Sequence, residues 1–243
     1  MPQTIAETGF DKQVQQVTRA ALNLLFPPRC AGCNKPGTEF CAECARSLMP
    51  IGEVVCATCG EPLSRPGLCA NCRNTERAFR QVRSAFRFEG PLRQAVHALK
   101  YNKRRSVAVP LAEHMARQLS GPDRTGMLLC AVPLHPSRLK ERGFNQSAEL
   151  ARQLAALWGI EWLPDGALQR VRATEKQVEL DQAARQANVA GAFGVADASQ
   201  VLGRAIILVD DVCTTGATLD ACAHALRAAG AAMVDGVTLA HQV

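Results

Sequence analysis

The 243-residue sequence predicts an α/β fold, with a parallel sheet flanked by helices and a smaller cysteine-rich domain in front of it. Residues 206–209 are four consecutive apolar residues, three of them β-branched, which is typical of a strand buried on both faces. Helical spacing over residues 219–226 follows a short Thr/Gly loop and ends before Gly230. Four Cys-x2-Cys pairs lie within residues 30–72. The hydrophobic content of 47% is sufficient for a full core.

Residues 1–27 predict an N-terminal amphipathic helix that ends at Pro27-Pro28. Its apolar residues form one helical stripe: Phe10, Val14, Val17, Ala21 and Leu24. The segment lacks the basic and apolar regions of a signal peptide, and no run of 18 apolar residues occurs, so we expect no membrane insertion. A cytoplasmic location is therefore expected. In that reducing compartment cysteines bind metal more readily than they form disulfides.

Residues 28–75 predict a double zinc ribbon. Two residues between cysteines let both thiolates reach one tetrahedral ion, and two such pairs supply four ligands. Free thiols or a redox motif would not explain the fourfold repetition. We therefore expect two structural Zn²⁺ ions, held by Cys30, Cys33, Cys41, Cys44, Cys56, Cys59, Cys69 and Cys72. Sequential pairing needs only short loops, while the spacing also allows a crossed pairing of the first turn with the third and the second with the fourth.

Basic residues are concentrated in the N-terminal part of the chain. Residues 1–110 contain 16 Lys/Arg and 8 Asp/Glu, whereas residues 111–243 contain 12 and 14. Residues 73–105 form a basic belt whose only acids are Glu76 and Glu89. A solvated charged face is the ordinary interpretation, and contact with single-stranded DNA is the alternative. The candidate contacts are Arg77, Arg80, Arg83, Arg87, Lys103, Arg104 and Arg105.

Residues 76–243 predict the α/β domain. Apolar alternation predicts a strand at 82–88, and Gly90-Pro91 opens a helix with Leu92, Val96 and Leu99 on its buried face. The remaining expectations follow in chain order: helix 110–119, strand 127–132, loop 133–145, helix 146–157, polar segment 170–188, and strands 192–195, 206–209 and 233–239.

A candidate binding site lies at the expected end of the 206–209 strand. Asp210 and Asp211 are followed by the loop Thr214–Thr218 and a helix N-terminus, an arrangement that binds anions through backbone N–H groups and hydroxyls. The two carboxylates would repel a phosphate, so we expect them to face sugar hydroxyls or a metal. A ribose 5-phosphate fits both requirements. The alternative is an acidic strand end that caps a helix in an ordinary α/β domain.

The loop 133–145 is a second candidate. It follows a predicted core strand and contains three cations among proline and glycine turns. Arg138 and Arg142 offer forked donors for a second anionic group. His135 is equally compatible with a turn residue and a ligand contact.

The acidic pair and its Thr/Gly loop resemble the phosphoribosyl pyrophosphate (PRPP) loop of type I phosphoribosyltransferases. The whole chain after residue 27 resembles the ComF family of competence-associated phosphoribosyltransferases. That closer resemblance is carried by the cysteine array and by Leu99-Lys100-Tyr101, Pro133-Leu134, Arg142-Gly143-Phe144-Asn145-Gln146, Gln177 with Arg185 and Asn188, and Val209-Asp210-Asp211-Val212.

The resemblance implies a type I phosphoribosyltransferase fold and a role for each loop. Asp210 and Asp211 would hold the ribose hydroxyls, with Mg²⁺ accompanying PRPP. Arg138 and Arg142 would neutralise the leaving pyrophosphate, and a segment near 170–188 would cover the sugar or form a polar surface helix. The 5-phosphate would bind the loop Thr214–Thr218. The PRPP-binding residues as a whole would be Asp210, Asp211, Cys213, Thr214, Thr215, Gly216, Ala217 and Thr218.

The implied function is transfer of a phosphoribosyl group to an unknown acceptor in DNA uptake or the use of external DNA. Hypoxanthine-guanine phosphoribosyltransferases carry an Asp general base where Thr214 stands, so purine salvage of that kind is disfavoured. No Walker A motif occurs, which excludes a P-loop motor. Two alternatives are a non-catalytic PRPP or nucleotide sensor that binds single-stranded DNA through the ribbon and belt, and a docking protein for other competence proteins. Cys213 is expected to be a small packing residue rather than an acidified thiol.

Overall fold

The computed structural model describes residues 27–121, 123–172 and 191–243. Almost all of the helix expected at residues 1–27 lies outside these ranges, as do Gln177, Arg185 and Asn188. Within the described ranges, no helix is both long and apolar enough to cross a bilayer.

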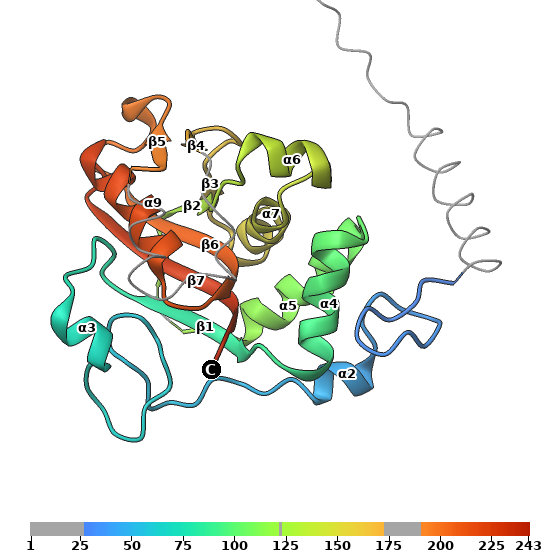
Figure 1. The fold of residues 1–243 in the computed structure, drawn as a ribbon. Coiled ribbons are helices and arrows are strands. Elements are labelled where there is room, and N and C mark those ends of the chain that lie inside the picture. Colours follow the sequence, from blue (N-terminus) through green and yellow to red (C-terminus); the bar gives the residue numbers. More distant parts are fainter. Residues whose placement is uncertain (1–26, 122, 173–190) are drawn as a thin grey trace, which may run out of the picture.

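A five-stranded parallel sheet forms the centre of the molecule (Figure 1). Its strand order is β1-β7-β6-β2-β3. The strands are β1 (Val82–Arg87), β2 (Leu128–Ala131), β3 (Glu161–Trp162), β6 (Ala205–Cys213) and β7 (Met233–His241). The central strand β6 pairs with β7 and β2 on its two sides, which explains why its apolar run is continuous rather than alternating. The predicted parallel α/β sheet is confirmed.

Helices cover both faces of the sheet. The helices α4 (Gly90–Tyr101), α5 (Ala108–Gln118) and α7 (Gln146–Trp158) share one core cluster with Ile207 and Val209. Helix α9 (Ala217–Ala228) packs on the other face with Ile206 and Leu208. Alternate residues of β6 therefore point into different halves of the core.

The expected loop 133–145 contains a helix, α6 (Pro136–Arg142), so the prediction of an irregular loop is wrong there. His135 is the N-cap and accepts from the Ser137 N–H, Pro136 occupies the first helical turn, and Gly143 ends the helix at φ +82°. The same residues that suggested turns are start and stop signals of a two-turn helix. His135 thus has a structural role as a cap.

Two strand predictions also need correction. Residues 193–195 form β5 (Phe193–Val195), which pairs antiparallel with β4 (Leu168–Arg170) in a separate two-stranded sheet instead of joining the main one. Strand β6 does not end at the acidic pair. It continues to Cys213 because β7 runs beside it up to His241, while the pairing with β2 stops at Val209.

The cysteine-rich segment wraps around the edge strand β1. We call residues 28–48 the first ribbon, with helix α2 (Ala42–Arg46), and residues 54–74 the second ribbon, with helix α3 (Ala70–Asn74). Between them, Met49 O accepts from Arg87 N–H at 2.8 Å and Ile51 N–H donates to Ala85 O at 3.1 Å. These bonds cover the open edge of the sheet. The first ribbon packs on the face covered by α4 and α5, and the second on the face covered by α9.

Candidate functional site

A cavity of about 660 Å³ opens at the carboxyl end of the parallel sheet. The segments after β1, β2, β6 and β7 all contribute to its wall, together with the end of α4 and the start of α7. This is the end at which open α/β sheets bind ligands. Every residue of the predicted PRPP loop and both predicted arginines line it: Asp210, Asp211, Cys213, Thr214, Thr215, Gly216, Ala217, Thr218, Arg138 and Arg142.

The acidic pair lies where β6 extends beyond β2. Adjacent residues of a strand point to opposite faces, so Asp210 and Asp211 would ordinarily be separated by the sheet. The ladder with β2 ends one residue earlier, at Val209, and both carboxylates therefore border the same cavity.

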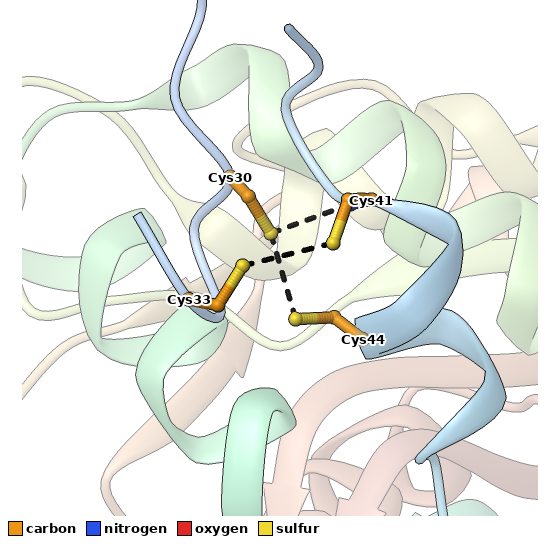
Figure 2. Close-up of side chains that lie close together, drawn as sticks. All are labelled: Cys30, Cys33, Cys41 and Cys44. Atoms are coloured by element: carbon orange, nitrogen blue, oxygen red, sulfur yellow. Dashed lines mark hydrogen bonds between the residues drawn. The ribbon is translucent and has the colours of Figure 1, made fainter. Parts of the chain in front are cut away.

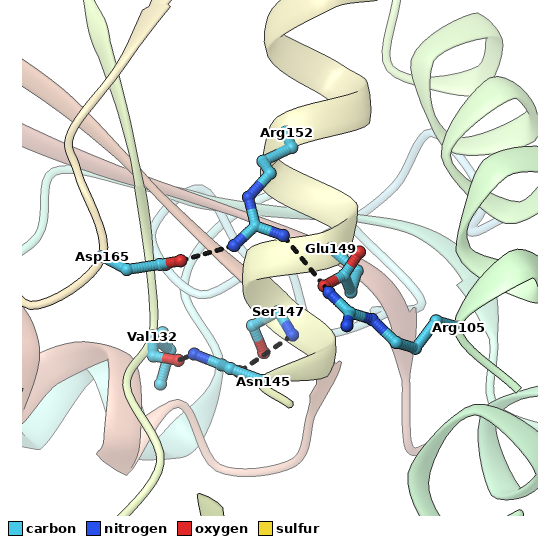
Figure 3. Close-up of polar contacts among 7 residues, drawn as sticks. All are labelled: Arg105, Val132, Asn145, Ser147, Glu149, Arg152 and Asp165. Atoms are coloured by element: carbon cyan, nitrogen blue, oxygen red, sulfur yellow. Dashed lines mark hydrogen bonds and ion pairs between the residues drawn. The ribbon is translucent and has the colours of Figure 1, made fainter. Parts of the chain in front are cut away.

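Each carboxylate has a partner from a different helix. Ser147 Oγ, at the start of α7, donates to Asp210 Oδ1 at 2.8 Å, and the Asp211 N–H donates to the same oxygen at 2.9 Å. Lys100, from the last turn of α4, forms an ion pair with Asp211. Asn145 fixes the start of α7: its Nδ2 donates to Val132 O at 2.9 Å and its Oδ1 accepts from Ser147 N–H (Figure 3).

Burial and neighbouring charges shift the pKa values of Asp210 and Lys100. Burial, reinforced by the charge of Asp211, raises the pKa of Asp210 to about 7. Burial alone would lower the pKa of Lys100, but the negative charges of Asp211 and Asp210 outweigh it and the pKa is raised. Two adjacent carboxylates beside one lysine make full ionisation of the pair unfavourable, and a further cation would favour it.

The Thr/Gly loop leads directly into α9. Gly216 is the N-cap at φ +74°, a conformation that favours glycine, and Thr215 Oγ1 accepts from the Ala217 N–H at 3.4 Å. The first turn of the 12-residue helix thus directs its N–H groups toward the cavity. The Cys213 thiol is buried, and burial raises its pKa to about 12. It is a packing group, as expected.

Arginine side chains form another part of the cavity wall. Arg142 donates to Gln146 Oε1, and its guanidinium lies 5.3 Å from the centre of the Tyr101 ring. Arg138 comes from the same helix, α6. Arg170, on β4, adds a third guanidinium whose pKa is lowered by burial and by the charge of Arg138. An anion between these groups would relieve their mutual repulsion.

The eight predicted zinc ligands form two clusters. Cys30, Cys33, Cys41 and Cys44 make the first cluster, whose thiols converge in Figure 2. Cys56, Cys59, Cys69 and Cys72 make the second. In each cluster all four sulfur atoms lie within 4.8 Å of one another, so the pairing is sequential. The crossed alternative is excluded.

Both clusters fit a zinc ion. Zn–S bonds of about 2.3 Å in a tetrahedron place neighbouring sulfurs about 3.8 Å apart. Cys30 and Cys44 are 3.6 Å apart, Cys33 and Cys41 3.7 Å, and Cys59 and Cys69 3.6 Å. Backbone N–H groups point at the sulfurs, as from Cys41 to Cys30 at 3.3 Å and from Cys69 to Cys56 at 3.4 Å. Such bonds favour thiolates, the form that binds metal.

The basic belt does not form one exposed surface. Four of its seven candidate residues are paired with carboxylates: Arg77 with Asp220, Arg80 with Asp235, Arg104 with Glu39, and Arg105 with Glu149. Arg83 donates to the carbonyl groups of Val82 and Ala57, and Lys103 lines the cavity. The Arg77 side chain is only 1% exposed, so its assignment to a nucleic-acid surface is wrong.

The reason lies in long-range pairing. The sequence shows two acids within the belt, whereas the structure supplies acids from distant elements. Arg105 shares Glu149 of α7 with Arg152, which also contacts Asp165 (Figure 3). These ion pairs hold α7 to its neighbours and reduce the net positive charge of the belt.

Three residues of the site were not predicted as ligand contacts. In the sequence Lys100 stands out only within the family motif Leu99-Lys100-Tyr101, and nothing local marks Ser147 as a partner of Asp210. Arg170 begins the polar segment 170–188 in the sequence, and the structure shows it in the cavity wall. All three reach the cavity from elements whose position only the packing of the sheet determines.

Two domain families match this chain. The double zinc ribbon domain matches residues 21–73, and the phosphoribosyl transferase domain matches residues 105–242, more than half of the chain. Among solved structures, the glutamine PRPP amidotransferase of B. subtilis aligns with a TM-score of 0.38 and 22% identity, covering 56% of this chain and 26% of that one.

Three relatives match this chain over most of their own length. "DNA utilization protein YhgH" of Salmonella typhimurium is 34% identical over 225 residues, covering 87% of this chain and 96% of that protein. "Competence protein ComFC" of Bacillus subtilis is 30% identical over 234 residues, covering 93% and 90%. "Competence protein F" of Haemophilus influenzae is 28% identical over 220 residues, covering 87% and 90%. The chain therefore belongs to the ComF/YhgH family of proteins with a phosphoribosyltransferase domain and an N-terminal double zinc ribbon.

Proposed function

We propose that this protein binds PRPP in the cavity at the carboxyl end of its sheet and transfers the phosphoribosyl group to an acceptor. One observation carries the proposal. The cavity has an acidic pair, a Thr/Gly loop at a helix N-terminus and a cationic helix on three of its walls. PRPP carries a diol, a 5-phosphate and a pyrophosphate, which these three groups complement.

The proposed reaction is a substitution at carbon 1 of the ribose. The bond between carbon 1 and the pyrophosphate oxygen breaks, its electron pair leaves with pyrophosphate, and a nucleophile of the acceptor forms the new bond. The Thr214–Thr218 loop would hold the 5-phosphate, and Arg138 and Arg142 would neutralise the charge that develops on the leaving group. No covalent intermediate with the protein is required.

The acidic pair fits a role at the ribose and its metal. Magnesium bound with PRPP would supply positive charge to the pyrophosphate and ribose oxygens. Asp210 and Asp211 would hold the hydroxyls and this ion, whose positive charge would favour the ionised form of Asp210. Lys100 is paired with Asp211 and lines the cavity, so it would also contact a ligand oxygen that binds beside Asp211.

Calorimetric titration with PRPP and Mg²⁺ tests the site. We expect the double variant Asp210→Asn/Asp211→Asn to lose about tenfold to a hundredfold in affinity, the effect of removing charged hydrogen bonds. Asp197→Asn is the matched control, because Asp197 caps a distant 3₁₀ turn, η3 (Ala198–Gln200), and Asn caps equally well. Equal affinity in all three proteins would refute the assignment. If PRPP binds and the double variant loses affinity, pyrophosphate release would be used to screen acceptors.

A non-catalytic adaptor remains the second candidate, since relatives are named for DNA utilization and competence. In this version the protein senses PRPP in the cytoplasm and binds single-stranded DNA, or another DNA-uptake protein, through its ribbons. Charge reversal at Arg83 and Arg87 would then weaken salt-dependent DNA binding and spare PRPP binding. The Asp210→Asn/Asp211→Asn variant would do the opposite. Pyrophosphate release with any acceptor would rule out an adaptor without turnover.

A further inference from the structure

Arg77 lies in the short connection between the second ribbon and β1, and its side chain is 1% exposed. Arginine is seldom buried to this extent unless it is paired. Its partners belong to the phosphate loop and the helix that follows, about 140 positions later in the sequence.

The contacts of Arg77 and its neighbour hold both sides of that loop. Arg77 Nη2 donates to Thr215 O at 3.3 Å, and Nη1 donates to Asp220 Oδ2 at 3.4 Å. The Ala78 N–H donates to the other oxygen of Asp220 at 2.8 Å. Asp220 in turn donates its own N–H to Gly216 O at 2.9 Å, closing the first turn of α9.

Phe79 supports the same loop from below. Phe79 is 2% exposed, and its ring lies so close to Gly216 that a Cβ at Gly216 would be 3.6 Å from Phe79 Cζ. Residues 77–79 therefore contact the loop through a charge, a backbone N–H and a ring. An unsupported loop would have to be ordered by the ligand at an entropic cost.

The second ribbon holds this segment in place. Only residues 73–76 separate Cys72 from Arg77, and α3 carries Cys72. All four cysteines of the second cluster share one core cluster with Phe79, Ala217 and Leu219. The first ribbon also shares a core cluster with the sheet domain, but on the face covered by α4, α5 and α7, away from the phosphate loop.

We infer that Arg77 is a positioning residue for the 5-phosphate loop and that it couples zinc in the second ribbon to ligand binding. The inference rests on the proposed PRPP site. A folded second ribbon places the guanidinium against Thr215 O and Asp220, which keeps the loop in its binding conformation. Coupling between two sites is reciprocal, so a ligand in the loop must also stabilise the second zinc site.

Ribose 5-phosphate and pyrophosphate are the probes, because they occupy different ends of the site. In the zinc-loaded full-length protein, Arg77→Met is expected to weaken ribose 5-phosphate at least about tenfold and to leave pyrophosphate affinity unchanged. Arg77→Lys should recover part of the loss. Arg204→Met is the control. Arg204 forms an ion pair with Glu161 at 3.3 Å, and neither residue lines the cavity.

The outcomes distinguish failure of the Arg77 inference from failure of the proposed PRPP site. Equal loss of both probes in Arg77→Met would indicate general damage and overturn the inference, as would unchanged binding of ribose 5-phosphate. Failure of the wild-type protein to bind either probe or PRPP would contradict the proposed function itself and remove the basis of the inference.

Zinc release from the wild-type protein provides a test that needs no variant. A chromophoric chelator should remove the two ions in two phases. Saturating ribose 5-phosphate should slow one phase about tenfold and leave the other unchanged, as reciprocal coupling to a single ribbon requires. Identical release with and without ribose 5-phosphate would overturn the inference.

Discussion

The two ribbons have the same ligands and the same spacing within each pair, but they occupy different environments. In the first cluster Cys33 is exposed and Cys41 is half-buried, whereas all four cysteines of the second cluster are buried. The first ribbon lies on the α4 and α5 face of the sheet, and the second lies on the α9 face beside the phosphate loop. A repeated metal motif can therefore serve two purposes, which its surroundings determine.

The two ribbons also contact different parts of the sheet domain. The first ribbon approaches α4 at Gly32, and Glu39 forms an ion pair with Arg104 and accepts from Ser106 Oγ at 2.7 Å. The second ribbon pairs with β1 itself, because Val82 N–H donates to Thr58 O at 2.7 Å. We therefore expect the second ribbon to be part of the folding unit of the sheet, and the first to be more independent of it.

Removal of a zinc ligand should give the largest difference. Cys56→Ser is expected to lower the free energy of unfolding by more than about 4 kcal/mol, because structural zinc contributes about 10–16 kcal/mol and all four ligands of the second cluster are buried. Cys33→Ser, at an exposed ligand, should cost about half as much. Elemental analysis of zinc per chain and thermal denaturation would measure both. Equal losses would show that the environment of the clusters does not matter.

A glycine-to-alanine substitution in each ribbon compares how closely the two ribbons pack against the sheet domain. Gly60 has φ +75°, and a Cβ there would lie 2.6 Å from Val82 O, so Gly60→Ala should cost about 2–4 kcal/mol through strain and a backbone clash. At Gly32 a Cβ would meet side chains and no backbone: Cys44 Sγ and Pro91 Cβ at 2.8 Å each and Phe40 Cε2 at 3.2 Å. Gly32→Ala should therefore cost about 1–3 kcal/mol.

Urea denaturation would measure these costs. Gly37→Ala is the control, since Gly37 has φ +122° with nothing within 4 Å, and it isolates the backbone strain. A smaller cost for Gly60→Ala than for Gly37→Ala would contradict the close contact between the second ribbon and β1.

The rates of zinc loss should also differ. The first cluster exposes Cys33 to a chelator directly, whereas the second must open locally before any sulfur is accessible. We expect the first ion to leave about tenfold faster, equivalent to an opening free energy of about 1.4 kcal/mol. Stopped-flow absorbance with a chromophoric chelator would resolve the phases. Cys33→Ser should abolish the faster one; loss of the slower phase instead would reverse the assignment.

The smallest effect is expected at the first ribbon's ion pair. Glu39 and Arg104 are each 27% exposed, so Glu39→Gln should lower the free energy of unfolding by about 0.5–1.5 kcal/mol without changing PRPP affinity. Chemical denaturation together with a PRPP titration would check both quantities. A change in PRPP affinity would mean that the first ribbon, too, is coupled to the ligand site.

The sequence alone determined the features that depend on local chemistry. Cys-x2-Cys turns mark zinc ligands wherever they occur, and a β-branched run followed by Asp210, Asp211 and a Thr/Gly loop marks a strand, an acidic pair and a helix N-terminus. Amphipathic spacing likewise placed α4 and α7 close to their observed bounds. These features require only neighbours within a few residues.

Tertiary structure decided the features that depend on which distant groups meet. The spacing allowed two pairings of the cysteine turns, and only the packed ribbons show that they are sequential. The local sequence of the belt predicts unpaired arginines, whereas the fold pairs four of them with acids from other elements: Glu39, Glu149, Asp220 and Asp235. Lys100 and Arg77 acquire their partners in the same way, because the energy of a buried charge depends on what surrounds it in space, which neighbouring sequence does not specify.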